Sequence, residues 1–246
     1  MLGLVQGVTE VVPVSSSAHL TLVPWLLGWP PAPDRTALAA GLHAGSCAGI
    51  ALALRAELRG LDRRTAVLLA TATLPAAAAG ALVADDVERR LGRPPQLAAL
   101  LAGAGVLLWA ADRRPARVDR VGPREAAVAG LAQVLALAPG VSRSGAVLTG
   151  LRVAGVEGAA ASRFALLLSL PVTFGAAALA LARADRTVLR GLARPLAAGV
   201  PLAAVSAHTA LRTVRRRGGT GTGGAALYRL ALAAAVTARL CRRGRP

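Results

Sequence analysis

The chain is dominated by apolar runs long enough to cross a lipid bilayer, and this feature restricts the folds open to it. A helix needs roughly 20 residues to span the hydrocarbon layer. Six apolar runs approach this length, near residues 36–56, 65–84, 96–111, 160–182, 195–211 and 225–240. Hydrophobic residues make up 54% of the 246 residues and the mean hydropathy is +0.54, which is too apolar for a water-soluble domain with a single core. The sequence therefore predicts an all-α integral membrane protein with six transmembrane helices.

Four other apolar runs are too short to span the bilayer, and they come as two pairs. They cover residues 1–12 and 18–29 in the first pair and 126–138 and 146–156 in the second. Pro13 and three serines interrupt the first pair, and Pro139-Gly140 interrupts the second. Non-helical backbone at membrane depth is tolerated inside protein or beside a watery cavity. We therefore expect each pair to form a re-entrant helix hairpin with its polar residues at the tip.

The two hairpins are similar in sequence, which indicates an internal repeat. Val14-Ser15-Ser16-Ser17-Ala18 aligns with Val141-Ser142-Arg143-Ser144-Gly145 at an offset of 127 residues. At the same offset, Gly3 and Gln6 align with Gly130 and Gln133. Each repeat, 1–118 and 119–246, would hold one hairpin and three spans within a single membrane domain. Three crossings are an odd number, so the second repeat enters from the opposite side, which is the inverted-topology architecture of many membrane proteins with a central binding site.

The charge of the chain suits a membrane surface better than a nucleic acid. The net charge is +17, and all 29 basic residues are arginine. These arginines lie in short connections between apolar runs, and aromatic residues make up only 2% of the chain, so we expect no nucleic-acid partner. Arginine is shared almost equally between the two sides of the expected topology, so the positive-inside rule does not decide the orientation. Cys47 and Cys241 are not expected to form a disulfide.

Three ionisable residues stand at the hairpin tips, where a charge is costly and indicates function. They are Glu10, His19 and Arg143. In an inverted repeat the two tips meet near the middle of the membrane. We therefore expect these residues to share one pocket with the serine hydroxyls of both tips, from Ser15, Ser16, Ser17, Ser142 and Ser144.

The second tip has the chemistry of an anion site. Gly140 allows close approach of the backbone, and the helix that follows offers free N–H groups and a positive dipole at its N-terminus. The Arg143 guanidinium is a planar fork that matches phosphate oxygens. The predicted ligand is a phosphate or diphosphate, and the surrounding bilayer favours one attached to a lipid.

The first tip carries candidate reactive groups. Ser16 and His19 are three residues apart, so one helical turn is expected to bring the hydroxyl to a base. Glu10 could orient His19, bind a divalent cation or act as the base itself. Gln6 lies one turn before Glu10 on the same face, where it could donate to phosphate.

Other polar residues of the apolar runs are expected to have structural roles. His43 and His208 lack polar neighbours in the sequence, so we expect both to pack in the core. Arg152 and Arg163 are expected to cap or pair near the second hairpin.

These motifs resemble the two signatures of the bacterial undecaprenyl-diphosphate phosphatases, also called bacitracin-resistance proteins. The first runs from Gln6 to His19 (QGVTEVVPVSSSAH) and the second from Pro139 to Gly145 (PGVSRSG). The segments SRFALLLSLP, from Ser162, and YRLALAAAV, from Tyr228, also resemble family segments. The resemblance covers nearly the whole chain.

The resemblance implies six spanning helices and two re-entrant helix pairs in inverted repeats. It implies hydrolysis of undecaprenyl diphosphate to undecaprenyl phosphate and inorganic phosphate at the outer face of the bacterial plasma membrane. That reaction recycles the carrier lipid for cell-wall synthesis, confers bacitracin resistance and is supported by a divalent cation, Mg²⁺ or Ca²⁺.

By motif position, the resemblance implies that Glu10 is the essential acid, Ser15 and Ser16 the hydroxyls, His19 the catalytic imidazole and Arg143 the group that binds the diphosphate. Glu10 is also the candidate metal ligand. Whether Ser16 attacks phosphorus or a water does so stays open. The oligomeric state, monomer or homodimer, also stays open.

The chain departs from the family pattern at several positions. Many members have Glu where this chain has Gln6. The lack of that carboxylate would weaken the cation site in this chain. The family usually has Gly in place of Ala18 and often Thr in place of Val147. The first helix also begins several residues late.

Two other functions use the same features. A polyprenyl-phosphate carrier that flips its lipid without hydrolysis would also have inverted repeats and broken helices. The Ser16 and His19 spacing favours the enzyme, because transport needs anion binding but no nucleophile and base. An inactive homologue would rest on Gln6 and Val147 alone.

Overall fold

All regular elements in the described part of the chain are α-helices. The computed structural model describes residues 1–30, 32, 34–216 and 221–243. The first half contains α1 (Leu2–Val11), α2 (Ser16–Leu27), α3 (Arg35–Ala53), α4 (Arg55–Arg59), α5 (Arg63–Leu91) and α6 (Pro94–Asp112). The second half contains α7 (Pro123–Leu135), α8 (Arg143–Val153), α9 (Gly158–Arg183), α10 (Arg186–Gly191), α11 (Ala193–Arg216) and α12 (Thr222–Arg243). The four short runs and six long runs expected from the sequence each correspond to one helix. The short helix α10 lies between two expected runs, whereas α4 begins at the end of the run expected at 36–56.

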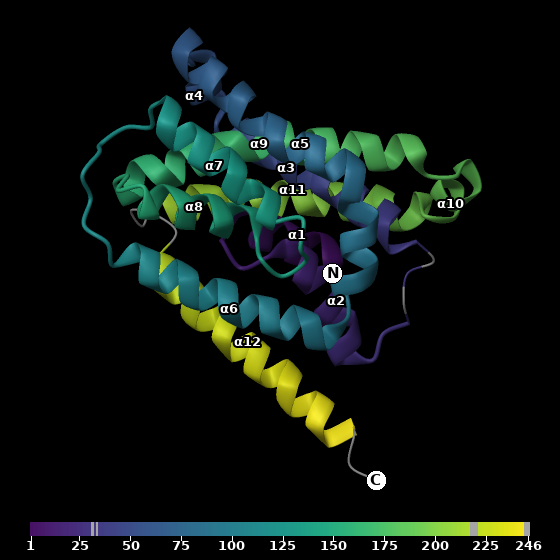
Figure 1. Cartoon of the computed structure of the whole chain (residues 1–246). Coiled ribbons are helices and arrows are strands. Elements are labelled where there is room, and N and C mark those ends of the chain that lie inside the picture. Colours follow the sequence, from purple (N-terminus) through teal and green to yellow (C-terminus); the bar gives the residue numbers. More distant parts are fainter. Residues whose placement is uncertain (31, 33, 217–220, 244–246) are drawn as a thin grey trace.

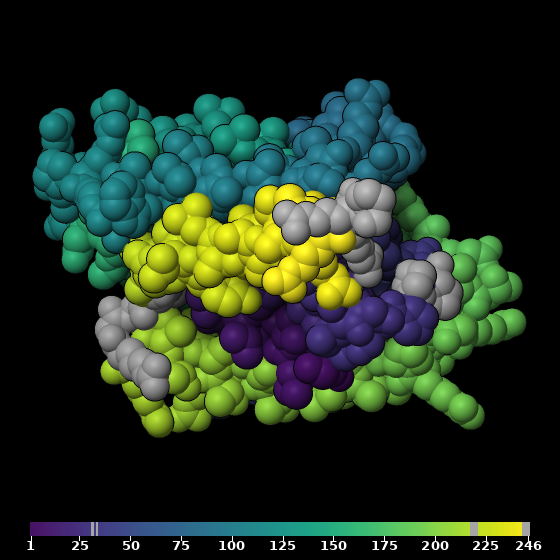
Figure 2. All heavy atoms as spheres, turned by 90° about the horizontal axis from the view of Figure 1, so that it is seen from below, coloured from purple at the N-terminus to yellow at the C-terminus, as the bar shows by residue number. Residues whose placement is uncertain are grey.

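Long helices packed side by side form the body of the molecule (Figure 1). Helix α3 packs against α9 and α11, and α5 packs against α7 and α9. Helices α6 and α12 form a long pair that crosses beneath the others, where α12 covers part of the face seen in Figure 2. The short helices α1 and α2, and likewise α7 and α8, contact each other. These four short helices lie between the long helices, so their side chains can meet in one site.

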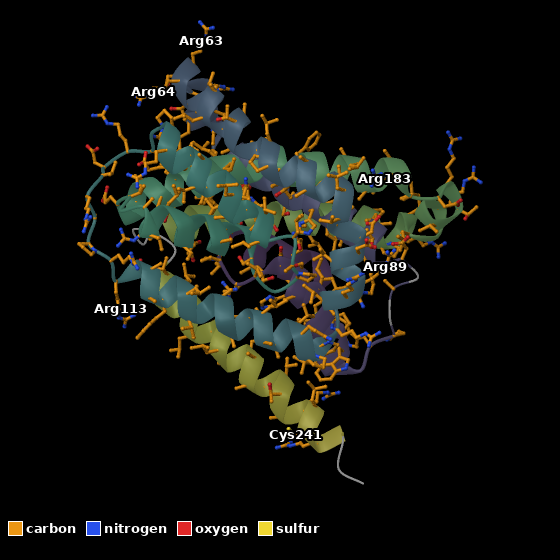
Figure 3. All side chains as sticks on the ribbon, in the orientation of Figure 1. Arg63, Arg64, Arg89, Arg113, Arg183 and Cys241 are labelled. Atoms are coloured by element: carbon orange, nitrogen blue, oxygen red, sulfur yellow. The ribbon has the colours of Figure 1, made fainter. Side chains whose placement is uncertain are left out.

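Within the described residues, five helices are long and apolar enough to cross a membrane: α3, α5, α6, α9 and α12. Helix α11 has 24 residues but falls outside this group. Its apolar run is interrupted by Pro201 and His208 and ends in several arginines. Large apolar side chains such as Leu82, 82% exposed, and Phe174, 62% exposed, face outward. Arg63, Arg64, Arg89, Arg113 and Arg183 lie at the ends of long helices around the edge of the molecule (Figure 3). This distribution is that of a multi-pass membrane protein.

The two cysteines lie apart and are both free, Cys47 buried in α3 and Cys241 exposed near the end of α12. The expectation that they do not form a disulfide is confirmed.

Glycines allow α3 and α11 to pack with their backbones in contact. A Cβ atom on Gly45 would lie 2.4 Å from the carbonyl oxygen of Val200, and one on Gly49 would lie 2.0 Å from that of Ala204. Both distances are far below van der Waals contact. Small residues at helix interfaces allow such approach, and they are a common means of helix association in membranes.

The substitution Gly49→Ala tests this packing. The new methyl group would push α3 away from α11, and overpacking of this kind costs about 1–3 kcal/mol. We expect a lower midpoint in a thermal aggregation assay of the purified protein in detergent. Gly103→Ala in α6 is the matched control, because nothing lies within 4 Å of a Cβ built there. Equal midpoints for the two variants would contradict the close packing.

Candidate active site

The two hairpin tips share an unusual backbone conformation. Among the described residues, Ser15 and Ser142 are the only ones other than glycine with a positive φ, at 73° and 69°. Each is the N-cap of its helix: the Ser15 hydroxyl accepts a hydrogen bond from the Ala18 N–H at 3.4 Å, and that of Ser142 accepts from the Gly145 N–H at 3.2 Å. Residues held in sparsely populated backbone regions cluster at functional sites. The duplication seen in the sequence therefore extends to backbone geometry.

The carboxylate of Glu10, at the end of α1, is the centre of a buried polar cluster. Its Oε2 accepts from the Ser16 hydroxyl at 2.6 Å and from the Gln6 amide at 3.0 Å. Its Oε1 accepts from Nη2 of Arg143 at 2.5 Å and from the Thr173 hydroxyl at 3.4 Å. The Glu10 side chain is 4% exposed and that of Arg143 is 17% exposed. The structure thus brings together Glu10, Ser16 and Arg143 from both hairpins.

His43 belongs to this cluster, and the expectation that it packs in the core is wrong. Its Nδ1 lies 3.2 Å from Oε2 of Glu10 and 2.7 Å from Nε2 of Gln6. The Ser46 hydroxyl, one turn later in α3, lies 3.2 Å from the same Gln6 nitrogen. The signal was present in the sequence, because an ionisable residue at membrane depth is a functional candidate even without polar neighbours. Its partners Gln6 and Glu10 are 37 and 33 residues earlier in the chain, so the sequence could not name them.

His19 does not pair with Ser16, contrary to the expectation from their spacing. Within the described part of the chain, Nδ1 of His19 donates to the Ser15 carbonyl at 2.7 Å, and Nε2 accepts from the Tyr228 hydroxyl at 2.7 Å. The two rings are stacked, with centroids 5.5 Å apart. Ser16 instead donates to Glu10, because a carboxylate is a stronger acceptor than a neutral ring. His19 therefore connects the first tip to α12.

The second tip is held by Arg229 of α12, which the sequence indicated only as part of a family segment. Its side chain is fully buried, and Nη2 donates to the carbonyls of Gly140 at 2.9 Å and Val141 at 2.7 Å. Gly140 has φ 100°, which glycine adopts without the penalty that a side chain would bring. A Cβ there would also approach α6, 3.2 Å from the Leu97 carbonyl oxygen. Glycine is therefore required for the tip to lie against α6.

The remaining candidate serines pair with each other within each tip. The Ser17 hydroxyl lies 3.2 Å from that of Ser15, and the Ser144 hydroxyl lies 3.3 Å from that of Ser142. Ser15 is buried and Ser17 is exposed. Val147 is buried in the main apolar cluster, so this position supplies no hydroxyl.

Arg152 has the structural role expected of it. It donates to three backbone carbonyls, those of Val156 at 2.7 Å, Asp112 at 2.9 Å and Arg114 at 2.8 Å. It therefore anchors the connection between the halves to the end of α8. Arg163 is exposed on α9.

Comparison with known proteins shows the family of the chain. The family model described as "Bacitracin resistance protein BacA" matches residues 1–235. A protein named undecaprenyl-diphosphatase from Gemmatimonas aurantiaca is 38% identical, and the match covers 99% of this chain and 97% of the relative. A protein of the same name from Geobacter sulfurreducens is also 38% identical, over 88% of this chain and 87% of the relative. The chain, which carries both tip motifs around one buried carboxylate, therefore belongs to the BacA family of bacitracin resistance proteins.

Proposed function

We propose that this protein is an undecaprenyl-diphosphatase, which hydrolyses undecaprenyl diphosphate to undecaprenyl phosphate and inorganic phosphate. The reaction recycles the carrier lipid for cell-wall synthesis and confers resistance to bacitracin. The main supporting observation is that a hydroxyl of one hairpin and a guanidinium of the other both bind the Glu10 carboxylate. Two relatives that match 99% and 88% of this chain bear the name of this activity.

The diphosphate binds at the second tip. Arg143 is the first residue of α8, where the helix dipole and the free N–H groups favour an anion. The guanidinium has donors left after its bond to Glu10, and these can reach phosphate oxygens as a bidentate pair. The hydroxyls of Ser142 and Ser144 add neutral donors. In the membrane, the phosphate oxygens thus take the place of water as hydrogen-bond partners of these donors.

The Ser16 hydroxyl is placed to attack the terminal phosphorus. Its proton passes to Oε2 of Glu10, 2.6 Å away, as the oxygen to phosphorus bond forms and undecaprenyl phosphate leaves. Water then hydrolyses the phosphoserine, and Glu10 returns the proton to Ser16. In the alternative course, Glu10 takes a proton from a water that attacks phosphorus directly. His19 is a positioning residue in either case, since it holds the Ser15 carbonyl next to Ser16.

We propose that a divalent cation, Mg²⁺ or Ca²⁺, assists the reaction at Glu10. No group of three His, Cys, Asp or Glu side chains that could hold a metal occurs among the described residues. Magnesium is commonly held by one or two carboxylates together with substrate phosphates. Glu10 fits this mode, because its carboxylate adjoins the anion site. When bound, the cation would neutralise charge on the phosphate oxygens.

We further propose that the two halves, 1–118 and 119–246, are inverted repeats with α1–α2 and α7–α8 as re-entrant hairpins and α11 as the sixth span. Gly3 lies against the carbonyl of Gly199, and Gly130 lies against that of Ala72. The two contacts are equivalent under the 127-residue offset: Gly3 aligns with Gly130, and Ala72 aligns with Gly199. The same offset relates Ser16 to Arg143, and both bind Glu10. The site would face the outer side of the plasma membrane.

The proposed function is tested by phosphate release from undecaprenyl diphosphate, with the purified protein in detergent and Mg²⁺. We expect steady release of phosphate above that of a protein-free control. A folded protein that releases none, yet moves undecaprenyl phosphate across a liposome membrane, would be a carrier and the proposal would be wrong.

The role of Ser16 is tested by Ser16→Ala beside Ser17→Ala. Loss of the nucleophile, or of its bond to the base, is expected to lower the rate by about 10²-fold or more. Ser17 is exposed and bonds only to Ser15 among the described residues, so Ser17→Ala is expected to stay within about twofold. Mass spectrometry of acid-quenched wild type would detect a phosphoserine. A Ser16→Ala rate equal to wild type would exclude the nucleophilic course.

A further inference from the structure

We infer that His43 is a nitrogen ligand of the cation site. The site therefore prefers transition-metal ions such as Mn²⁺ and Co²⁺ to Ca²⁺. The inference deepens the proposed function, on which it rests. It concerns three groups that converge beside the substrate site: the Gln6 amide, Oε2 of Glu10 and Nδ1 of His43.

These three groups form a triangle of the size that one metal ion requires. The amide nitrogen of Gln6 lies 3.0 Å from Oε2 of Glu10 and 2.7 Å from Nδ1 of His43, and the third side measures 3.2 Å. An octahedral ion with ligands at about 2.1 Å places neighbouring ligands about 3.0 Å apart. All three groups lie on two adjacent helices, α1 and α3, so their spacing does not depend on a flexible loop.

The Gln6 amide has an oxygen without a partner. Gln6 is completely buried, and its Oε1 has no hydrogen-bond partner among the described residues. A half-turn of the amide would exchange the positions of Oε1 and Nε2, which have almost the same shape. Oε1 would then stand at the apex of the triangle, 3.2 Å from the Ser46 hydroxyl, which would turn from the His43 carbonyl to donate to it.

The two amide orientations suit two different roles of the cluster. With Nε2 at the apex, the amide can donate to Oε2 of Glu10 and to Nδ1 of His43. A bound cation would instead require an acceptor at the apex, and Oε1, Oε2 and Nδ1 would supply one amide oxygen, one carboxylate oxygen and one imidazole nitrogen. The same three residues can therefore form a hydrogen-bonded cluster or a ligand set.

The charge of the cluster also calls for a cation when diphosphate binds. Glu10 and Arg143 are ion-paired, so their charges cancel before the substrate arrives. A divalent ion beside Oε2 gives the cluster a net charge of about +2, which complements a diphosphate. The imidazole nitrogen of His43 makes the ligand set softer than the oxygen-only sets that Ca²⁺ prefers, and it favours transition-metal ions.

The test measures metal binding directly, without substrate turnover. Full-length protein in detergent is titrated with Mn²⁺, free ion is followed by electron paramagnetic resonance, and bound ion is examined for nitrogen hyperfine coupling by pulsed methods. We expect one bound Mn²⁺ with imidazole coupling in wild type. His43→Gln is expected to abolish the coupling and weaken binding by about 10- to 100-fold. His208→Gln in α11 is the matched control and is expected to leave both unchanged.

The chain has only three histidines, so the assignment does not depend on a single variant. Should His43→Gln fail to fold, coupling that persists in both His19→Gln and His208→Gln assigns the ligand to His43. Coupling that persists in His43→Gln overturns the inference. Bound Mn²⁺ without nitrogen coupling also overturns the inference. A protein that binds no Mn²⁺, either alone or with methylenediphosphonate, overturns it as well. In these cases His43 is only a hydrogen-bonding partner of Glu10.

Phosphate release by the same samples separates this inference from the proposed function. Release by wild type without nitrogen coupling would refute the His43 ligand and leave the phosphatase intact. Nitrogen coupling without release would support the cation site and refute the phosphatase.

Discussion

Arg143→Ala is expected to lower phosphate release from undecaprenyl diphosphate by about 10²–10³-fold, the usual effect of removing one preorganised donor to a developing charge. The variant removes the guanidinium at the α8 N-terminus and leaves Glu10 without its cationic partner. Both losses act on the phosphate, because an unpaired carboxylate repels the incoming anion. The measurement is initial rate against substrate concentration for wild type and variant in the same detergent.

Two further arginine variants make the result specific. Arg143→Lys keeps the charge but not the planar fork, so we expect it to recover only a small part of the rate. Arg163→Ala removes an exposed arginine of α9 and is expected to behave as wild type. An Arg143→Ala rate within about tenfold of wild type would mean that the diphosphate is bound elsewhere.

Glu10→Gln is expected to reduce the rate by about 10²–10⁴-fold, the range for loss of a general base. The amide keeps the size of the carboxylate but neither accepts the Ser16 proton nor balances Arg143. The exposed Glu157, whose side chain makes no cap hydrogen bond at the start of α9, gives the matched control Glu157→Gln. Rates are compared at equal amounts of monodisperse protein. Full activity of Glu10→Gln would exclude Glu10 as base and as charge partner.

Stability measurements separate the two roles of Glu10. Removing one member of a buried ion pair costs about 3–5 kcal/mol, whereas replacing both by apolar groups is often neutral or stabilising. We therefore expect Glu10→Gln to lower the thermal midpoint and Glu10→Leu with Arg143→Met to restore it without restoring phosphate release. A double variant as unstable as the single one would show that the cluster is needed for folding as well.

Features that depend on neighbouring residues could be predicted from the sequence. The six long runs correspond to helices because a span is decided locally, by about 20 apolar residues and the polar residues that end them. The run expected at 160–182 is observed as Gly158–Arg183, and that at 126–138 as Pro123–Leu135. The tips were also predictable, because a proline follows the first short helix of each pair and a serine precedes the second. Glu10 and Arg143 were predictable as candidates because they are ionisable residues beside the tips, and the 127-residue offset aligns Ser16 with Arg143.

Contacts between distant segments could not be predicted in this way. The spacing of Ser16 and His19 indicated a pair, but Glu10 and Tyr228 provide nearer or stronger partners for each. Tyr228 is 209 residues from His19, and Thr173 is 163 residues from Glu10. Only the packing of α9 and α12 against the hairpins decides these distances.

The sequence by itself determined the membrane class, the helices, the two tip motifs and the candidate residues at the tips, because apolar runs and polar interruptions act within one or two turns. The tertiary structure alone decided how those residues are paired. It placed His43 beside Glu10 and gave Ser16 the carboxylate as its acceptor, because a buried polar group must find its partner among whatever segments pack around it. That packing is a property of the whole fold.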